Sequence, residues 1–312
     1  MGEIAALSRA FDTEFNKHYE ALPRLAHDPD HDTFLNHYRQ VQRIAESIAY
    51  YASRLPPYAS VHRILAFGDR LAQREEHRLA LEACYSYVKH LNIHQRNVVR
   101  ADELTCLSWH VQACYGVAVC EATLVLHQDP QMKHPDTLAA VVACLHQLKD
   151  VLVLVLPSEQ LYWLTLNGTL HIYSLAKRLL TAGYVAQMLP FMVFCVKALE
   201  SHVIFSTSKY LTWRTQLYIS LCYAYCDVRE HGMAKQVVQE GLSKIDALIK
   251  LQKLDPVPAP PEVQAAYRTA KAMLCALKLK LEVICAPSGS GESRFAHPKC
   301  PREWCSCQTD VL

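Results

Sequence analysis

Glycine is scarce in this chain of 312 residues, which contains only nine glycines. A β architecture needs glycine in many of its turns, so this scarcity, together with abundant alanine and leucine, favours helices. Runs of alternating apolar and polar residues bounded by turn signals are also missing, so we expect no sheet. The sequence therefore predicts an all-α fold.

An excess of charge of one sign is missing as well. The chain has 32 lysine and arginine residues against 30 aspartate and glutamate residues, for a formal net charge of +2. Without a basic stripe to neutralise phosphates, we expect no nucleic-acid partner. A hydrophobic share of 51% is typical of a globular protein that can fill a substantial core.

The usual signatures of secretion and of catalysis are absent too. Residues 1–15 carry charges and no apolar segment of signal-peptide type, so we expect a cytosolic protein. No glycine-rich phosphate loop, nucleophile elbow or HExxH motif occurs, and nothing specifies a reaction. We therefore predict no catalytic, cofactor-binding or metal-binding residues and no small-molecule substrate.

Cysteine, by contrast, is plentiful, with thirteen residues in the chain. Nine of them lie in apolar segments with helical periodicity, so we expect small core residues in a reducing compartment and not a disulfide framework. These nine are Cys84, Cys106, Cys114, Cys120, Cys144, Cys195, Cys222, Cys226 and Cys275.

Helical periodicity recurs along most of the chain, and prolines and polar clusters separate the segments. Asp32 is placed to cap the second helix, and Pro56 and Pro57 separate the second helix from the third. A proline-rich connector, residues 254–261, precedes the last helix. The predicted helices cover residues 2–22, 32–55, 59–74, 77–93, 101–127, 135–156, 159–182, 184–203, 207–230, 232–253 and 260–285.

The stretch LYWLTLNGTLHIYSLAKRLL, residues 161–180, has three interpretations. Asn167-Gly168 between apolar flanks is a strong hairpin signal, and Asn167-Gly168-Thr169 is a glycosylation sequon. Apolar residues at helical spacing instead place Gly168 on the packed face of one long helix. A hairpin here would have no sheet to join, so we predict the helix and a close approach of a neighbouring element at Gly168.

Internal repeats of tetratricopeptide type support this interpretation. The pattern requires large, small and aromatic residues at fixed positions on two antiparallel helices. Irregular spacing between the copies predicts an irregular α-solenoid of antiparallel helical pairs, tetratricopeptide-like, over residues 1–285. Two clear copies and a weaker one fit: Ile64, Phe67, Gly68, Leu71, Ala80 and Cys84; Tyr218, Leu221, Cys222, Tyr225, Ala234, Val238 and Gly241; and Leu170, Tyr173, Ser174 and Ala186.

Leu179 to Val196 is an uncharged run of 18 residues, long enough to be weighed as a membrane span. Gly183 and Pro190 interrupt it, and we favour two buried helices joined at Gly183, with no membrane. Because proline disrupts a helix interior, we expect the second helix to kink at Pro190 or to begin near Met188.

Three groups of metal-ligand residue types remain. His297, Cys300, Cys305 and Cys307 lie close together, but their spacing lacks the two-residue knuckle of a zinc site, so we favour a disordered cysteine-containing tail over residues 286–312. Helix-spaced pairs occur at residues 222 and 226 and at residues 90 and 94. We interpret the cysteine pair as core packing and the histidine pair as a polar helix end.

Several stretches resemble the N-terminal region of the cilia- and flagella-associated protein 54 family. They occur in the family's order over about residues 60–285, and aromatic and small positions match as well as the helical period. The stretches are FGDRL at 67–71, LALEACYSYV at 79–88, ACLHQL at 143–148, LPSEQLYWLTLNGTLHIYSLAKRLL at 156–180, KYLTWRTQLY at 209–218 and SKIDAL at 243–248.

This resemblance implies a non-enzymatic scaffold in the central apparatus of the ciliary and flagellar axoneme. It further implies other axonemal proteins as partners and a role in cilium assembly and movement, including that of sperm flagella. The family members are far longer, and residues 286–312 match no family pattern, so we expect an alternative terminus, a truncated product or a gene-model artefact there. A cytosolic tetratricopeptide-like adaptor that binds partner peptides is the alternative.

Overall fold

The computed structural model describes residues 2–24, 30–91, 103–254 and 259–284, and these contain helices and no strand. The all-α prediction is therefore confirmed for the described part of the chain, whereas the solenoid arrangement stays a prediction. The chain divides into two compact units, Met1–Leu175 and Ala176–Leu312. The division falls inside one continuous helix, α8 (Tyr162–Ala182).

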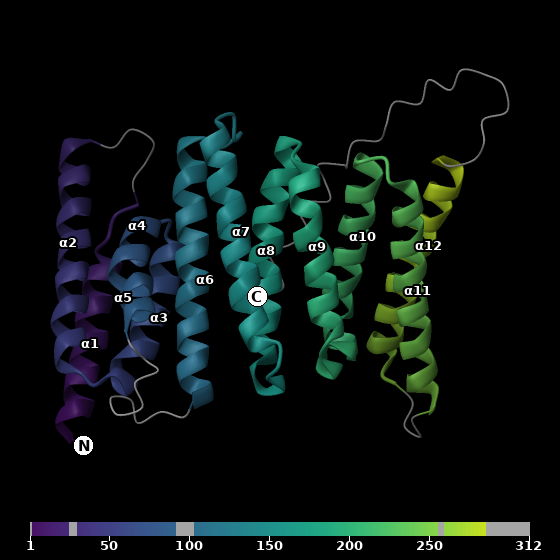
Figure 1. Ribbon diagram of the computed structural model, residues 1–312. Coiled ribbons are helices and arrows are strands. Elements are labelled where there is room, and N and C mark those ends of the chain that lie inside the picture. The colour runs from purple at the N-terminus through teal and green to yellow at the C-terminus, as the bar shows by residue number, and fades with distance from the viewer. Residues whose placement is uncertain (1, 25–29, 92–102, 255–258, 285–312) are drawn as a thin grey trace. The chain divides into compact units, whose positions relative to one another are not determined.

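The first unit is a row of helices that pack side by side (Figure 1). The helix expected over residues 77–93 is continuous from His77 to His90, but it contains the π-helical turn η1 between α4 and α5. The elements before α8 are α1 (Gly2–Glu20), α2 (His31–Arg54), α3 (Pro57–Gln73), α4 (His77–Leu79), η1 (Ala80–Tyr85), α5 (Ser86–His90), α6 (Glu103–Gln128), α7 (Pro135–Val155) and the 3₁₀ turn η2 (Glu159–Leu161).

The second unit begins with the end of α8 and is also helical (Figure 1). The segment expected to be one helix over residues 207–230 begins with a 3₁₀ turn, and its α-helix starts at Leu211. The elements after α8 are α9 (Val185–Glu200), the 3₁₀ turns η3 (Val203–Ser206) and η4 (Ser208–Tyr210), α10 (Leu211–Asp227), α11 (His231–Leu254) and α12 (Pro261–Ile284).

Aromatic rings from α1, α2 and α3 fill the core at the start of the first unit. The Phe15 and Phe67 rings stack with centroids 3.7 Å apart, and Phe11 meets Phe67 edge-on at 4.9 Å. Phe11 also stacks on Tyr51 of α2. Such pairs add stabilisation beyond the apolar area that they bury, and Phe11 joins α1 to both α2 and α3.

Both clear copies of the repeat pattern correspond to packed helical pairs. In the first copy Gly68 of α3 faces Cys84 of η1, where a Cβ on the glycine would lie 3.0 Å from the Cys84 Cβ. In the second copy Gly241 of α11 lies against the Tyr218 ring of α10. The weaker copy is wrong as a core pattern, because Ser174 is exposed.

Gly168 lies on the buried face of α8, as the helical interpretation predicted. A Cβ there would lie 2.5 Å from the Tyr115 hydroxyl oxygen of α6 and 2.6 Å from Leu152 Cδ1 of α7. The Tyr115 hydroxyl donates a hydrogen bond to the Leu164 carbonyl at 3.3 Å. The absent side chain thus makes room for a tyrosine that joins α6 to α8.

Gly183 ends α8, which confirms that the uncharged run of residues 179–196 is two helices. Its φ is +89°, and its N–H bonds to the Leu180 carbonyl while the Tyr184 N–H bonds to the Leu179 carbonyl. This pair of bonds is the Schellman motif, in which glycine is favoured because the backbone is left-handed. The expected start near Met188 is wrong, since α9 begins at Val185 with Pro190 inside it.

Two further expectations need correction or comment. Asp30, and not Asp32, caps α2, because the Asp30 Oδ1 accepts a hydrogen bond from the Thr33 N–H at 2.7 Å. By length and composition α7 could cross a membrane, with a mean hydropathy of 1.9 and 33% of that stretch buried. One such helix is weak support for a span, because the core helix of a soluble protein has the same character.

Candidate interaction site

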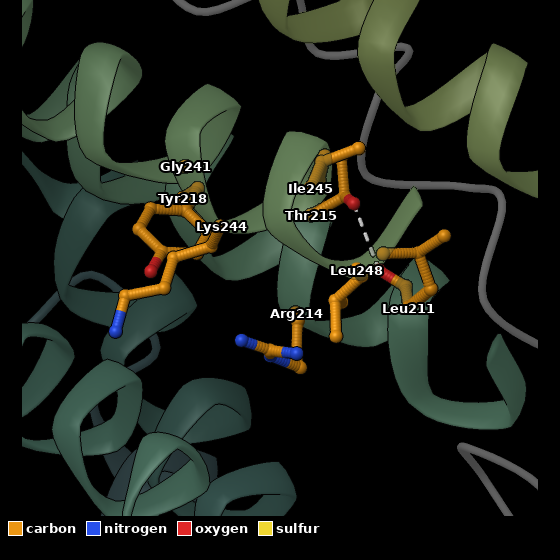
Figure 2. Close-up of a pocket in the computed structure, with 8 residues that line it drawn as sticks. All are labelled: Leu211, Arg214, Thr215, Tyr218, Gly241, Lys244, Ile245 and Leu248. Carbon is orange, nitrogen blue, oxygen red and sulfur yellow. Dashed lines mark hydrogen bonds between the residues drawn. The ribbon is translucent and has the colours of Figure 1, made fainter. Parts of the chain in front are cut away.

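A narrow hollow lies between α10 and α11 in the second unit, and its empty volume is about 210 Å³. Pockets for cofactors and drug-sized ligands measure roughly 300–1,000 Å³, so the hollow is too small for such a ligand. Figure 2 shows the residues that line it, with four from each helix. They are Leu211, Arg214, Thr215, Tyr218, Gly241, Lys244, Ile245 and Leu248.

Helical periodicity brings these residues to one surface. Residues three and four apart on α10 share a face, and the same spacing holds for the lining residues of α11. Gly241 permits the close approach of the two helices, since a Cβ there would lie 3.2 Å from the Tyr218 ring. The Thr215 hydroxyl bonds to the Leu211 carbonyl at 2.8 Å and is satisfied within α10.

Arg214 is the most unusual residue of the hollow, because it is only 7% exposed. Its Nη1 donates to the Phe205 carbonyl at 3.2 Å, whereas its buried Nε has no hydrogen-bond partner. None of the ion pairs between described residues includes Arg214. Burial of a guanidinium is costly unless a carboxylate or several acceptors pair with it.

The second cation of the hollow, Lys244, has a carboxylate near it. Its Nζ lies 3.8 Å from Glu200 Oε2, and its side chain is 48% exposed. Glu200 also accepts a hydrogen bond from the Tyr218 hydroxyl. Burial and this bond raise the pKa of Tyr218, so its hydroxyl stays protonated and donates. The Glu200 carboxylate is therefore bound to Tyr218 and lies near Lys244, and it does not balance the charge of Arg214.

The metal-ligand types considered from the sequence do not form a cluster where the structure describes them. No group of three or more His, Cys, Asp or Glu side chains that could hold a metal ion occurs among the described residues. His90 bonds to the Ser86 carbonyl at 2.6 Å at an exposed position. His94 and the tail residues His297, Cys300, Cys305 and Cys307 lie outside the described residues.

Cys222 and Cys226 do come together at the end of α10. Cys222 is buried, and Cys226 is half-buried. Hydrogen bonds from the Cys222 thiol and from His231 lower the pKa of Cys226. Of the nine cysteines expected in the core, seven are buried, and Cys226 and Cys275 are half-buried. Sequence reasoning interpreted the pair as packing and did not predict the contact with His231.

Sequence reasoning also missed the hollow itself. The KYLTWRTQLY and SKIDAL stretches contain seven of the eight lining residues, but their periodicity indicates only that this face is buried. Arg214 within that face was the available signal, since arginine is rarely buried without a partner.

Two motifs quoted from the sequence meet directly in the first unit. Asp69 of FGDRL accepts a hydrogen bond from the Tyr85 hydroxyl of LALEACYSYV at 2.6 Å. The backbone at Gly68 meets the same tyrosine ring. These positions are thus constrained by packing between α3 and η1.

Comparison with known proteins identifies the family of the chain. The family profile of cilia- and flagella-associated protein 54 matches residues 35–287. The chain belongs to the cilia- and flagella-associated protein 54 family. The match begins before residue 60, so the family pattern also covers most of α2.

Curated members of the cilia- and flagella-associated protein 54 family match this chain with sequence identities between 27% and 50%. The Chlamydomonas reinhardtii protein is 50% identical over 285 residues, which is 90% of this chain. The human and mouse proteins are 29% and 27% identical and cover 78% of it. The chain spans 8–9% of the length of these relatives, so it corresponds to a small part of each.

Proposed function

We propose that the chain is a non-enzymatic structural scaffold of the ciliary and flagellar axoneme, in the central apparatus. In this role it acts in cilium assembly and movement, including that of sperm flagella, by binding other axonemal proteins. The observation that carries the proposal is the 50% identity to the Chlamydomonas protein over 285 residues. The name of that relative associates it with cilia and flagella.

An irregular α-solenoid of tetratricopeptide-like pairs suits such a scaffold. Each helical pair adds surface for partners without requiring a reactive group. Two packed pairs, α3 with η1 and α10 with α11, support this arrangement within their own units. In this proposal the chain therefore acts through packing between its helices and through binding across their outer faces.

A chimera tests the proposal. Residues 1–285 of this chain replace the matching segment of the Chlamydomonas protein, in cells that lack the native copy. We expect the chimera to remain in axonemes after detergent extraction and to restore swimming. A biotin ligase fused to it should label central-apparatus proteins.

The matched control is the same chimera with Gly116→Leu, which places a large side chain against the buried Tyr85 ring and prevents packing. We expect this control to be lost from axonemes. A folded chimera that is extracted entirely by detergent, or that labels only cytosolic proteins, would favour the adaptor alternative over the scaffold.

A further inference from the structure

Cys222 and Cys226 are the only two of the nine described cysteines that stand four residues apart in the sequence. This spacing places both side chains on one face of α10, one helical turn apart. Cys222 is fully buried, whereas Cys226 is half-buried and lies in the last turn of the helix. Cys226 is therefore the member of the pair that a small reagent in solution can approach.

The turn after α10 adds a histidine to this pair. The Arg229 N–H bonds to the Cys226 carbonyl at 3.0 Å, and the Glu230 N–H bonds to the Tyr225 carbonyl at 2.8 Å. The chain reverses here, with a positive φ of 64° at Arg229, and His231 begins α11 beside Cys226. A second thiol and an imidazole thus both contact the Cys226 sulfur.

These two neighbours favour the ionised form of Cys226. Hydrogen bonds from the Cys222 thiol and from His231 lower the pKa of Cys226, although burial and Asp227 act in the opposite direction. The hydrogen bond with Cys226, together with burial, raises the pKa of Cys222, which keeps its proton and donates it. Because the thiolate is the nucleophilic form of cysteine, Cys226 is the reactive thiol of the pair.

We propose that Cys226 is a site of oxidation by hydrogen peroxide and that Cys222 then closes a disulfide with it. The Cys226 thiolate attacks one peroxide oxygen, the O–O bond breaks, and the departing hydroxide takes a proton from solvent, which leaves a sulfenic acid and water. The Cys222 sulfur then attacks the Cys226 sulfur, the S–O bond breaks, and the hydroxide leaves as water with the Cys222 proton. The two thiols thus lose two electrons, which reduce the peroxide to water.

The end of α10 can form this bond with a local adjustment. Residues four apart on an α-helix have Cα atoms about 6 Å apart, within the range of about 4.4–6.8 Å that a disulfide spans. Their Cβ atoms lie about 5–6 Å apart, which is farther than a relaxed disulfide allows, so the last turn has to shift. Cys226 is the second-last residue of α10, so the shift is confined to the end of the helix. We expect a strained disulfide that a reductant opens easily.

Peptide mapping of the folded full chain by mass spectrometry tests both steps. Trypsin releases Cys222 and Cys226 together in residues 215–229, and Cys275 in residues 272–278. After brief treatment with hydrogen peroxide, alkylation and digestion, residues 215–229 should lack two hydrogen atoms and carry no alkyl group. Cys275 is also half-buried and has no cysteine within four residues, so it is the internal control. We expect its oxidation to be at least about threefold slower.

Variants of the three residues separate their roles. In Cys222→Ala the sulfenic acid at Cys226 should persist, and dimedone should trap it on residues 215–229. Cys226→Ala should leave Cys222 unoxidised, because Cys222 is buried. His231→Gln should slow the oxidation of Cys226 by about threefold or more, since it removes a group that favours the thiolate. Cys275→Ala is the matched control and should form the disulfide as the original chain does, and circular dichroism verifies the fold of each variant.

Several results would overturn the proposal. If residues 215–229 keep both thiols while Cys275 is oxidised, Cys226 is not the reactive site. A disulfide from Cys226 to one of the four cysteines beyond residue 284 would exclude Cys222 as its partner. Formation of the same disulfide at an equal rate in urea-unfolded chain would show that the folded arrangement contributes nothing.

Discussion

Gly116 and Gly168 show how single atoms decide the packing of the first unit. A Cβ at Gly116 would overlap the ring of Tyr85, which is buried and bonded to Asp69. At Gly168 the conflict is with the Tyr115 hydroxyl. In both places the missing side chain of a helix glycine leaves room for a tyrosine from a neighbouring element. In that position the tyrosine hydroxyl donates a hydrogen bond.

We expect Gly116→Ala to lower the free energy of unfolding by about 2 kcal/mol, because overpacking costs more than the gain of about 1 kcal/mol in helix propensity. Gly168→Ala should act in the same direction. Gly232→Ala is the control, because nothing lies within 4 Å of a Cβ there. Urea unfolding monitored by circular dichroism measures all three. Equal stability of the three variants would contradict the packing argument.

His171 makes the stability of the first unit depend on pH. Its ring packs near Tyr115 with centroids 5.6 Å apart, and burial lowers the pKa of His171 to about 4. The unfolded chain binds a proton below about pH 6.5, whereas the folded chain does not bind it until about pH 4, so acid favours unfolding. The contribution of neutral His171 to the free energy of unfolding is therefore lost as the pH falls from 7 toward 4.

We expect a loss of about 1–2 kcal/mol from His171 between pH 7 and pH 5. His171→Gln removes the titrating group, and its stability should fall less over the same interval. Urea unfolding at both pH values gives the comparison. A variant whose pH dependence equals that of the original chain would show that other groups cause the acid sensitivity.

The residues also show how far sequence reasoning reaches. Gly168 was predicted to lie at a close approach because apolar residues flank it at helical spacing on both sides. Gly116 was missed, because its neighbours in α6 are apolar on nearly all sides and give no clear stripe. The Arg214 hollow was missed for a related reason, since periodicity reports which face is buried but not which buried group lacks a partner.

Helix ends illustrate the element scale. Among the described residues, three other than glycine have a left-handed backbone, and one of them, Arg229, follows α10 in the position that Gly183 has after α8. The Glu230 N–H bonds to the Tyr225 carbonyl at 2.8 Å, so both ends have the same hydrogen-bond pattern. Arg229 adopts it at a conformational cost that Gly183 avoids.

Opposite substitutions should therefore have opposite effects. Gly183→Ala should destabilise the chain by about 1 kcal/mol, and Arg229→Gly should stabilise it by about 0.5–1 kcal/mol. No atom lies within 4 Å of a Cβ at Gly183, so the first effect would come from the backbone alone. Thermal melts of both variants measure the shifts. A change of the same sign in both would contradict this account of the caps.

Most helix limits follow from the sequence to within a few residues, because prolines and caps have local causes. Pro56 and Pro57 fix the start of α3, and Gly183 fixes the end of α8. The start of α9 at Val185 agrees with the predicted limit at residue 184, and only the alternative start near Met188 is wrong, because the helix accepts Pro190 in its interior. The π-helical turn η1 was missed too, since its sequence has ordinary helical periodicity.

At the scale of the whole molecule, the division between the two units falls within α8 and not in a loop. The large core cluster of the first unit uses residues between Phe11 and Cys120. A cut after Leu175 would break hydrogen bonds of α8, whereas a cut after Gly183 keeps the helix and its cap. The sequence gives no signal of this division, because α8 has unbroken periodicity.

We expect residues 1–183 to unfold cooperatively with a higher melting temperature than residues 1–175. The shorter fragment lacks the last turns of α8 and leaves carbonyls without partners. Circular dichroism melts of both fragments, with the full chain as reference, test this expectation. Equal melting temperatures, or no cooperative transition in residues 1–183, would contradict the expectation that the last turns of α8 stabilise the first unit.

The buried thiols have a consequence for how the protein survives stress. Burial raises the pKa of Cys120 to about 12 and that of Cys144 to about 11, so these two thiols are hardly ionised in the native protein. Unfolding would return these groups to ordinary reactivity all at once. In oxidising surroundings, transient unfolding would then allow non-native disulfides to form, and refolding would require a reductant.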